Sequence, residues 1–343
     1  MALLPQPQES PAAGCFDFYG LAIEVRSTSA TLVEEVRRDF AYFHASPGRE
    51  PVRIQVHFVP PPYEGLPVIP AAFFTPRNVC FRAEHVTYID YFGRGLAVFD
   101  RREKRCAVYG TDEDLVHEIV YLFILSTVGQ YLDSRGIHRV HALGVSYRQQ
   151  GVLLLLPSGG GKSTMALSLL REPEFMLLSE DTPLIDRRGM MLPFPLRLGV
   201  RPEQQPDIPA QYLRTVRRME FDPKTLIDLE YFQDRVGQPV MPRFLLVGER
   251  SLGEVAQLVP LAPRHALKAV IKDMVVGLGI YQGLEFLLER GAWELLGQGG
   301  VAASRLYNGL RLLARASAYR FVLGRNLEKN RQTLLEFLHD KCA

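Results

Sequence analysis

Short runs of alternating apolar and polar residues dominate the first third of the chain. This alternation, with a period of two residues, is typical of strands with one buried face. Clusters of proline and glycine separate the runs, and residues 29–43 have helical spacing instead. The strand-like runs are residues 21–26, 52–59, 85–91 and 96–99. The pattern predicts a small α+β domain with an antiparallel sheet over residues 14–110.

A long apolar stretch follows at residues 115–132. Polar residues interrupt it, which favours a helix buried in protein over a membrane span. These residues are His117, Glu118, Ser126 and Gln130. Thr111-Asp112 supplies an N-cap, and Gly136 supplies a helix end. We therefore expect a linking helix over residues 111–135 and no membrane partner.

Beyond residue 136, strand-like and helix-like segments alternate, as they do in α/β domains. The expected strands are 138–145, 152–156, 175–178, 244–249 and 318–323, with a hairpin formed by 183–186 and 190–192. Residues 200–240 are polar and proline-punctuated, which predicts an excursion on the surface or over the active site. Residues 264–341 are largely helical apart from a glycine-rich break at 297–300. The pattern predicts a single α/β domain over residues 136–343.

The most specific motif joins the strand at 152–156 to the helix that follows it. The chain reads Leu-Pro-Ser-Gly-Gly-Gly-Lys-Ser-Thr, a P-loop with leucine and proline at its entry. Consecutive glycines let the backbone curl so that successive N–H groups face an anion. Lys162 supplies a cation for the β- and γ-phosphates, and Ser163 supplies a hydroxyl for Mg²⁺. The predicted nucleotide-binding residues are Ser158, Gly159, Gly160, Gly161, Lys162, Ser163 and Thr164.

Two acidic residues, Glu180 and Asp181, end the next strand. Phosphoryl transfer needs a carboxylate that holds Mg²⁺ and a group that accepts the nucleophile's proton. A βαβ unit places the carboxyl ends of its strands side by side, so both carboxylates are expected to reach the phosphates. The alternative is an exposed acidic turn. His141, on the strand before the loop strand, is a third candidate, with His138 as its competitor and a buried core histidine as the alternative.

Composition narrows the class of protein. A chain of 343 residues is long enough for two domains, and a net charge of +2 gives no reason to expect a nucleic-acid partner. The four cysteines are scattered without metal-ligand spacing, as reduced thiols in a cytosolic protein are. Residues 1–13 lack the basic and apolar regions of a signal peptide and predict a disordered lead-in. We therefore expect a cytoplasmic protein.

The segment from His141 through the glycine loop to Asp181 resembles the catalytic core of HPr kinase/phosphorylase and its kinase relatives. Phe194-Pro-Leu-Arg and residues 258–267 also resemble this group, and the likeness covers residues 135–325. It implies the fold of phosphoenolpyruvate carboxykinase, with ATP and Mg²⁺ as cofactors. Some relatives are found with peptide-modification genes, which makes a protein or peptide the expected partner. True HPr kinases assemble as hexamers, so a homo-oligomer is also an expectation.

The resemblance assigns a role to each matching residue. Lys162 and the backbone of residues 158–163 bind the triphosphate, and Ser163 and Asp181 hold Mg²⁺. Glu180 with His141 orients and deprotonates the acceptor hydroxyl. Arg197 is the candidate for stabilising charge in the transition state, with a surface arginine as the alternative.

Two positions and one missing segment depart from the family. Glu180 replaces an aspartate, Leu156 replaces the first loop glycine, and the Glu-x-Arg-Gly-x-Gly segment linked to phosphorolysis is not found. The sequence predicts an ATP- and Mg²⁺-dependent kinase for a hydroxyl of a peptide or protein Ser/Thr. The alternatives are a kinase for a small-molecule alcohol and a nucleotide-responsive binding protein with a degenerate loop. An ABC-type ATPase is rejected, because no Leu-Ser-Gly-Gly-Gln follows and the acidic strand comes too early.

Overall fold

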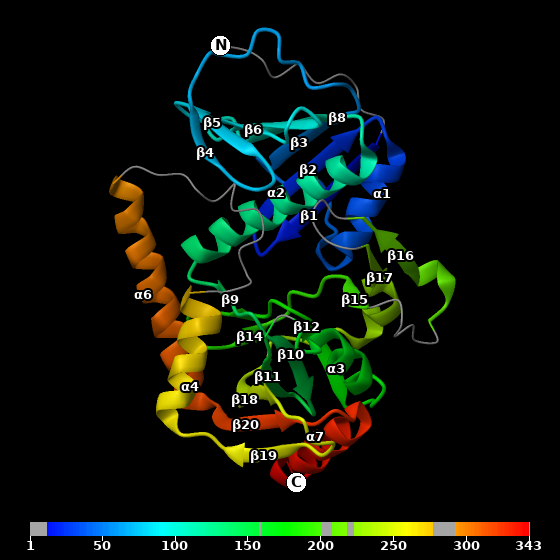
Figure 1. Ribbon diagram of the computed structural model, residues 1–343, viewed down its shortest axis with the longest axis vertical. Coiled ribbons are helices and arrows are strands. Elements are labelled where there is room, and N and C mark those ends of the chain that lie inside the picture. The colour runs from blue at the N-terminus through cyan, green and yellow to red at the C-terminus, as the bar shows by residue number, and fades with distance from the viewer. Residues whose placement is uncertain (1–11, 158, 201–207, 218–222, 277–291, 343) are drawn as a thin grey trace. The chain divides into compact units, whose positions relative to one another are not determined.

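The computed structural model describes residues 12–157, 159–200, 208–217, 223–276 and 292–342 (Figure 1). It is a mixed α/β structure with several sheets, in agreement with the α/β (α+β) class predicted from the sequence. The chain divides into two compact units. The first comprises Met1–Tyr131, Arg201–Glu230 and Gln282–Leu288, and the second comprises Leu132–Val200, Tyr231–Tyr281 and Glu289–Ala343. The described residues 208–217 and 223–230 therefore group with the first unit, whereas the domain predicted from the sequence, 136–343, includes them.

An eight-stranded sheet forms the framework of the first unit, in the order β1-β2-β3-β8-β7-β6-β5-β4. Its strands are β1 (Ala12–Phe18), β2 (Leu21–Ser27), β3 (Val52–His57), β4 (Ala71–Phe74), β5 (Val79–Ala83), β6 (Val86–Asp90), β7 (Gly95–Asp100) and β8 (Arg105–Gly110). The lead-in predicted for residues 1–13 lies outside the described residues as far as residue 11, and Ala12 already begins β1. The prediction of an antiparallel sheet was wrong in part, because β3 pairs in parallel with both β2 and β8. A helix connects β2 to β3, and such crossovers join parallel strands.

Two helices pack on this sheet, α1 (Ala30–Asp39) and α2 (Glu113–Ser134) (Figure 1). Phe123 of α2 meets Phe99 of β7 edge-on, and Phe40, at the end of α1, stacks on Tyr121 of α2. By length and composition α2 is apolar enough to cross a membrane, contrary to the sequence-based reasoning. However, 72% of its apolar window is buried inside the protein, as in the core helix of a globular domain. A hairpin of β16 (Leu213–Val216) and β17 (Lys224–Ile227) also belongs to this unit.

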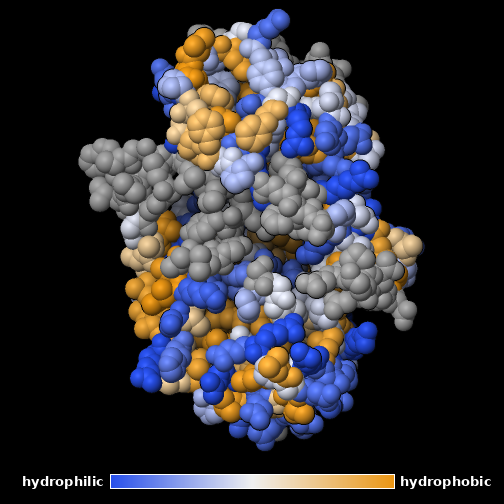
Figure 2. All heavy atoms as spheres, in the orientation of Figure 1, coloured by the Kyte–Doolittle hydropathy of each residue, from blue (hydrophilic) through white to orange (hydrophobic). Residues whose placement is uncertain are grey.

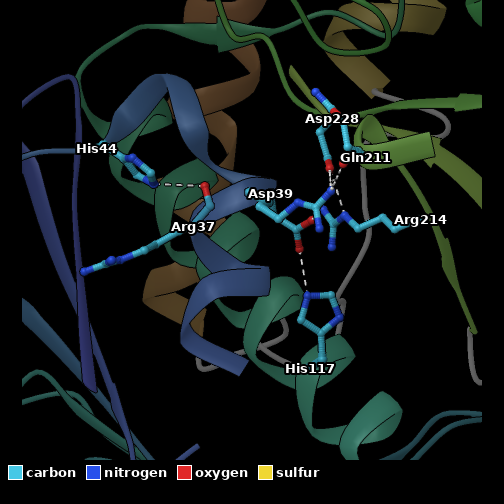
Figure 3. A network of polar contacts seen from close by, with 8 residues as sticks. Arg37, Asp39, His44, His117, Gln211, Arg214 and Asp228 are labelled. Carbon is cyan, nitrogen blue, oxygen red and sulfur yellow. Dashed lines mark hydrogen bonds and ion pairs between the residues drawn. The ribbon is translucent and has the colours of Figure 1, made fainter. Parts of the chain in front are cut away.

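A buried ionic network links α1, α2 and the β16–β17 hairpin (Figure 3). Asp39 binds His117 Nε2 at 2.8 Å and the guanidinium of Arg214. Arg214 Nε lies 2.8 Å from Asp228, which also binds Arg38. Because both carboxylates are almost fully buried, each depends on these cations. The network thus fastens the hairpin, which lies within the segment 200–240 predicted as an excursion on the surface or over the active site, to the helices of the first unit.

A six-stranded sheet forms the core of the second unit, in the order β12-β10-β11-β18-β20-β19. Its strands are β10 (Leu143–Tyr147), β11 (Gln150–Leu155), β12 (Phe175–Ser179), β18 (Pro242–Arg250), β19 (Gln257–Pro260) and β20 (Ser317–Leu323). Helices α4 (Pro263–Val270) and α6 (Ala292–Arg315) cover one face, and α3 (Lys162–Leu169) and α7 (Leu327–Cys342) lie on the other (Figure 1). Leu153, Leu155 and Leu245 of the central strands pack with Val270 and Leu312 of the first pair of helices.

Several elements of the second unit depart from the sequence-based expectation. The strand expected at 138–145 is divided into β9 (His138–Arg139) and β10, with His141 between them. The hairpin of β13 (Leu184–Ile185) and β14 (Met191–Leu192) is confirmed. The break expected at 297–300 was wrong: α6 continues through these glycines, although each glycine costs a helix about 1 kcal/mol.

The outer face of α6 is apolar near its middle. Leu306, Tyr307 and Leu310 are 37%, 50% and 48% exposed, and hydrophobic surface gathers over this helix in Figure 2. Exposed apolar patches of this kind mark contact surfaces in many proteins. The homo-oligomer expected from the sequence stays a prediction.

Candidate functional site

The glycine loop turns tightly, with two of its glycines in the left-handed region. Gly159 and Gly161 have φ values of +71° and +93°, in the left-handed region that glycine alone enters freely. A Cβ at Gly160 would lie 2.7 Å from the Pro157 carbonyl oxygen, which accepts the Gly160 N–H at 2.8 Å. All three glycines are therefore required by the turn. Ser158, also predicted to bind the phosphates, lies outside the described residues.

Lys162, the first residue of α3, is buried with its ammonium group inside a polar cluster. Its Nζ lies 2.8 Å from His141 Nε2, 3.1 Å from Asp181 Oδ1 and 3.1 Å from the Leu156 carbonyl oxygen. An ammonium has three N–H donors and no acceptor, so these contacts use all three. Of the three residues predicted to lie near Lys162, the structure brings His141 and Asp181 into contact with its ammonium group.

Strand order explains how these residues meet. Strand β10 lies between β11 and β12 and is antiparallel to both, so the carboxyl ends of β11 and β12 and the start of β10 share one edge. The expectation that the acidic strand adjoins the loop strand was therefore wrong. Backbone hydrogen bonds from Ala142 N to Asp181 O, at 3.0 Å, and from Val140 N to Pro183 O, at 3.0 Å, hold His141 opposite the acidic pair.

Asp181 supplies the negative charge of the cluster. Burial opposes its ionisation, but the contact with the His141 side chain and the charge of Lys162 outweigh burial and lower its pKa below the usual 3.8. His141 Nε2 lies 3.3 Å from the carboxylate. Since Nε2 accepts a hydrogen bond from the Lys162 ammonium, His141 orients both charged groups.

Glu180 and Ser163 form a second contact at the same edge. The Ser163 hydroxyl donates a hydrogen bond to Glu180 Oε1. Thr164 follows in the first turn of α3 and is half-buried. Arg197 directly precedes β15 (Leu198–Val200), a strand that packs beside α3. Its assignment as a charge-stabilising group stays a prediction.

The structure also decides between the two candidate histidines. His138 is fully buried, and both its ring nitrogens are occupied: Nδ1 by Asp133 and Nε2 by Ser304, each at 2.8 Å. Arg305 binds the same Asp133 carboxylate at 2.7 Å. His138 therefore has no ring nitrogen left for a ligand, and only His141 contacts Lys162 among the two.

Three residues near the loop were missed by sequence reasoning. Arg250, at the end of β18, donates to the Gly160 carbonyl oxygen at 2.9 Å. The carbonyl oxygen of Asp273 accepts the His141 N–H at 2.9 Å. Gly248 lies against Leu156: a Cβ at this glycine would be 2.2 Å from Leu156 Cδ2. Arg250 and Gly248 could be placed beside the loop only from the parallel register of β11 with β18, in which Leu155 pairs with Val247.

This contact explains the unusual first loop residue. The Leu156 side chain is 2% exposed and fills the space that a side chain at position 248 would need. Its carbonyl oxygen meanwhile accepts from Lys162. Leu156 is thus a core residue whose backbone supports the loop lysine.

Among the described residues, no three His, Cys, Asp or Glu side chains are grouped so as to hold a metal ion. Magnesium bound with phosphates retains waters and needs only one or two protein oxygens, so a site of the Ser163–Asp181 kind does not require such a group. No protein-family model matches the sequence, and no curated protein matches it at a significant level.

Proposed function

We propose that this protein is an ATP- and Mg²⁺-dependent kinase that phosphorylates a hydroxyl group, on Ser or Thr of a peptide or protein. The observation that carries the proposal is the cluster of Lys162, His141 and Asp181 at the end of a glycine loop. The resemblance of the same residues to the HPr kinase/phosphorylase core, with its phosphoenolpyruvate carboxykinase-like fold, supports it.

The residues present fit a nucleoside triphosphate. The first N–H groups of α3 have no intrahelical acceptor, and the helix end is positive, so both favour an anion above Gly161. Lys162 supplies a positive charge beside the phosphates, and Arg250 adds a second cation beside the loop at Gly160. Ser163 and Asp181 are the oxygen ligands for Mg²⁺, with Glu180 beside Ser163.

Each side chain then has a defined task. Bound Mg·ATP supplies an electrophilic γ-phosphorus whose charge needs stabilisation during transfer. Lys162 and the loop amides balance that charge, and His141 keeps Lys162 and Asp181 in place for it. Catalysis of this type consists almost entirely of positioning and electrostatics, which suits a preorganised cluster of buried charges.

The test is transfer of label from γ-labelled ATP to a library of Ser- and Thr-containing peptides, to metabolite alcohols and to water. Lys162→Ala should abolish both Mg·ATP binding and transfer. Lys329→Ala, which removes an exposed lysine paired with Glu254, serves as the matched control and should behave like wild type. Full transfer by Lys162→Ala would contradict the proposal. Labelling of alcohols without peptides would favour the small-molecule kinase.

A further inference from the structure

Asp273 reaches the site through the backbone of His141. It lies in a π-helical turn, η5 (Ile271–Val276), that continues α4. Single π-helical turns are rare and occur frequently at functional sites. The Asp273 carbonyl oxygen binds the His141 N–H, and Met274 packs in the same core cluster as Val140 and Ala142, the neighbours of His141. The turn is thereby fastened to the segment that positions His141.

The residue Asp273 is 8% exposed. Burial raises its pKa, and the nearby charges of Lys272, His141 and Lys162 offset this only in part. In the described part of the chain, no hydrogen bond or ion pair joins its carboxylate to another side chain. Carboxylates in largely buried residues normally have such partners, and the Asp273 oxygens are instead left to solvent or to a ligand.

The other carboxylates of the site are already occupied. Asp181 is held by Lys162 and His141, which lower its pKa and make it a weak base. Glu180 accepts the hydrogen bond of Ser163. Two neighbouring carboxyl groups whose environments shift their pKa values in opposite directions are the usual sign of divided roles in acid–base chemistry. Here the surroundings of Asp181 favour its ionised form, as a Mg²⁺ ligand requires, whereas those of Asp273 favour the uptake of a proton.

Resting on the kinase function proposed above, we propose that Asp273 is the catalytic base that accepts the proton of the acceptor hydroxyl. The hydroxyl oxygen forms the new bond to the γ-phosphorus while its proton passes to an Asp273 carboxylate oxygen. The bond from the γ-phosphorus to the bridging oxygen breaks, and its electron pair leaves with the diphosphate. His141 and Glu180, which the family resemblance assigned to orienting and deprotonating the acceptor hydroxyl, then act as positioning residues.

The competing explanation is that Asp273 only stabilises the π-helical turn, and Asp273→Asn separates the two. As a general base, Asp273 should contribute about 10²–10⁴-fold to the rate. The variant should therefore lose at least about 100-fold in kcat while its Kd for Mg·ADP stays within about 2-fold of wild type. Because asparagine removes a buried, unpaired carboxyl group, the variant should be at least as stable to urea as wild type. A structural role would predict the reverse: lower stability with nearly normal turnover.

The assay measures phosphate transfer to water and to the peptide library, so it does not depend on knowing the acceptor. Asp340→Asn, on the exposed surface of α7, is the matched control and should be unaffected. Asp273→Glu should recover part of the rate, and wild-type kcat should rise with pH along a limb that Asp273→Asn lacks. If Lys162→Ala is inactive but Asp273→Asn turns over within about 3-fold of wild type, the base assignment is wrong and the kinase function stands. If wild type transfers no more label than Lys162→Ala, both proposals fail.

Discussion

Substitutions at the contact between Leu156 and Gly248 test why leucine occupies the first position of the glycine loop. Leu156 is 2% exposed, and burial this complete makes Leu→Ala cost about 3 kcal/mol through lost transfer energy and a cavity. Gly248→Ala alone would place its Cβ 2.2 Å from Leu156 Cδ2, an overlap that costs about 1–3 kcal/mol. In the double variant the new methyl group enters space that the leucine has vacated.

The two substitutions should therefore compensate each other. We expect the double variant to be less destabilised than the sum of the single variants by at least about 1 kcal/mol, since residues in contact couple by about 0.5–3 kcal/mol. The assay is urea unfolding of the four proteins, followed by a titration with Mg·ADP. Under the proposed function nucleotide affinity should change little, because the proposal assigns binding to the loop backbone and Lys162 and not to the Leu156 side chain.

Additive free energies, equal within about 0.5 kcal/mol, would refute the packing argument. So would a Leu156→Ala variant that unfolds like wild type but no longer binds nucleotide. That second result would move Leu156 from the core into the binding site and revive the idea of a degenerate loop. A Gly248→Ala variant as stable as wild type would likewise show that the leucine side chain yields without cost.

Two further predictions concern charged groups. Asp181 has a lowered pKa, so the stability that it contributes should be present above its unfolded pKa near 3.8 and lost as the pH falls through its folded pKa. Urea unfolding of wild type and Asp181→Asn from pH 7 to pH 3 should show the difference in their unfolding free energies shrinking at the acid end. A difference in unfolding free energy that stays constant with pH would contradict the ion pair. Arg214→Met should destabilise the first unit by about 3–5 kcal/mol, because Asp39 and Asp228 stay buried without their shared cation. Thermal unfolding measures this effect, and the exposed Arg217→Met is the control: equal melting temperatures would show that the network contributes nothing.

The glycine loop was readable from the sequence because its chemistry is local. Gly159, Gly160, Gly161 and Lys162 adjoin in the chain, and the conformations that the turn requires are those that glycine alone adopts freely. The strands and helices flanking it were readable for a similar reason, since periods of 2 and 3.6 residues report burial along a single element. The buried helix α2 was predicted for the same reason, because its apolar residues are consecutive in the chain.

The partners of the loop could not be read in this way. The choice of His141 over His138 depends on which ring nitrogens Asp133 and Ser304 occupy, and Ser304 lies 166 residues from His138 in the chain. Arg250 reaches Gly160 only because β18 pairs in parallel with β11. Such contacts depend on the order of strands in the sheet, which hydrophobic periodicity does not encode.

By itself, the sequence determined the residues capable of phosphate chemistry, from Gly159 to Ser163 together with the acidic pair and a histidine. The tertiary structure alone decided how they meet: β10 inserts between β11 and β12, so that His141 stands between Lys162 and Asp181. It also decided that the backbone of Asp273, on another element, holds the His141 N–H. The physical reason is that a charge's environment is the sum of every element packed around it, whereas a motif specifies only the chain on which the charge lies.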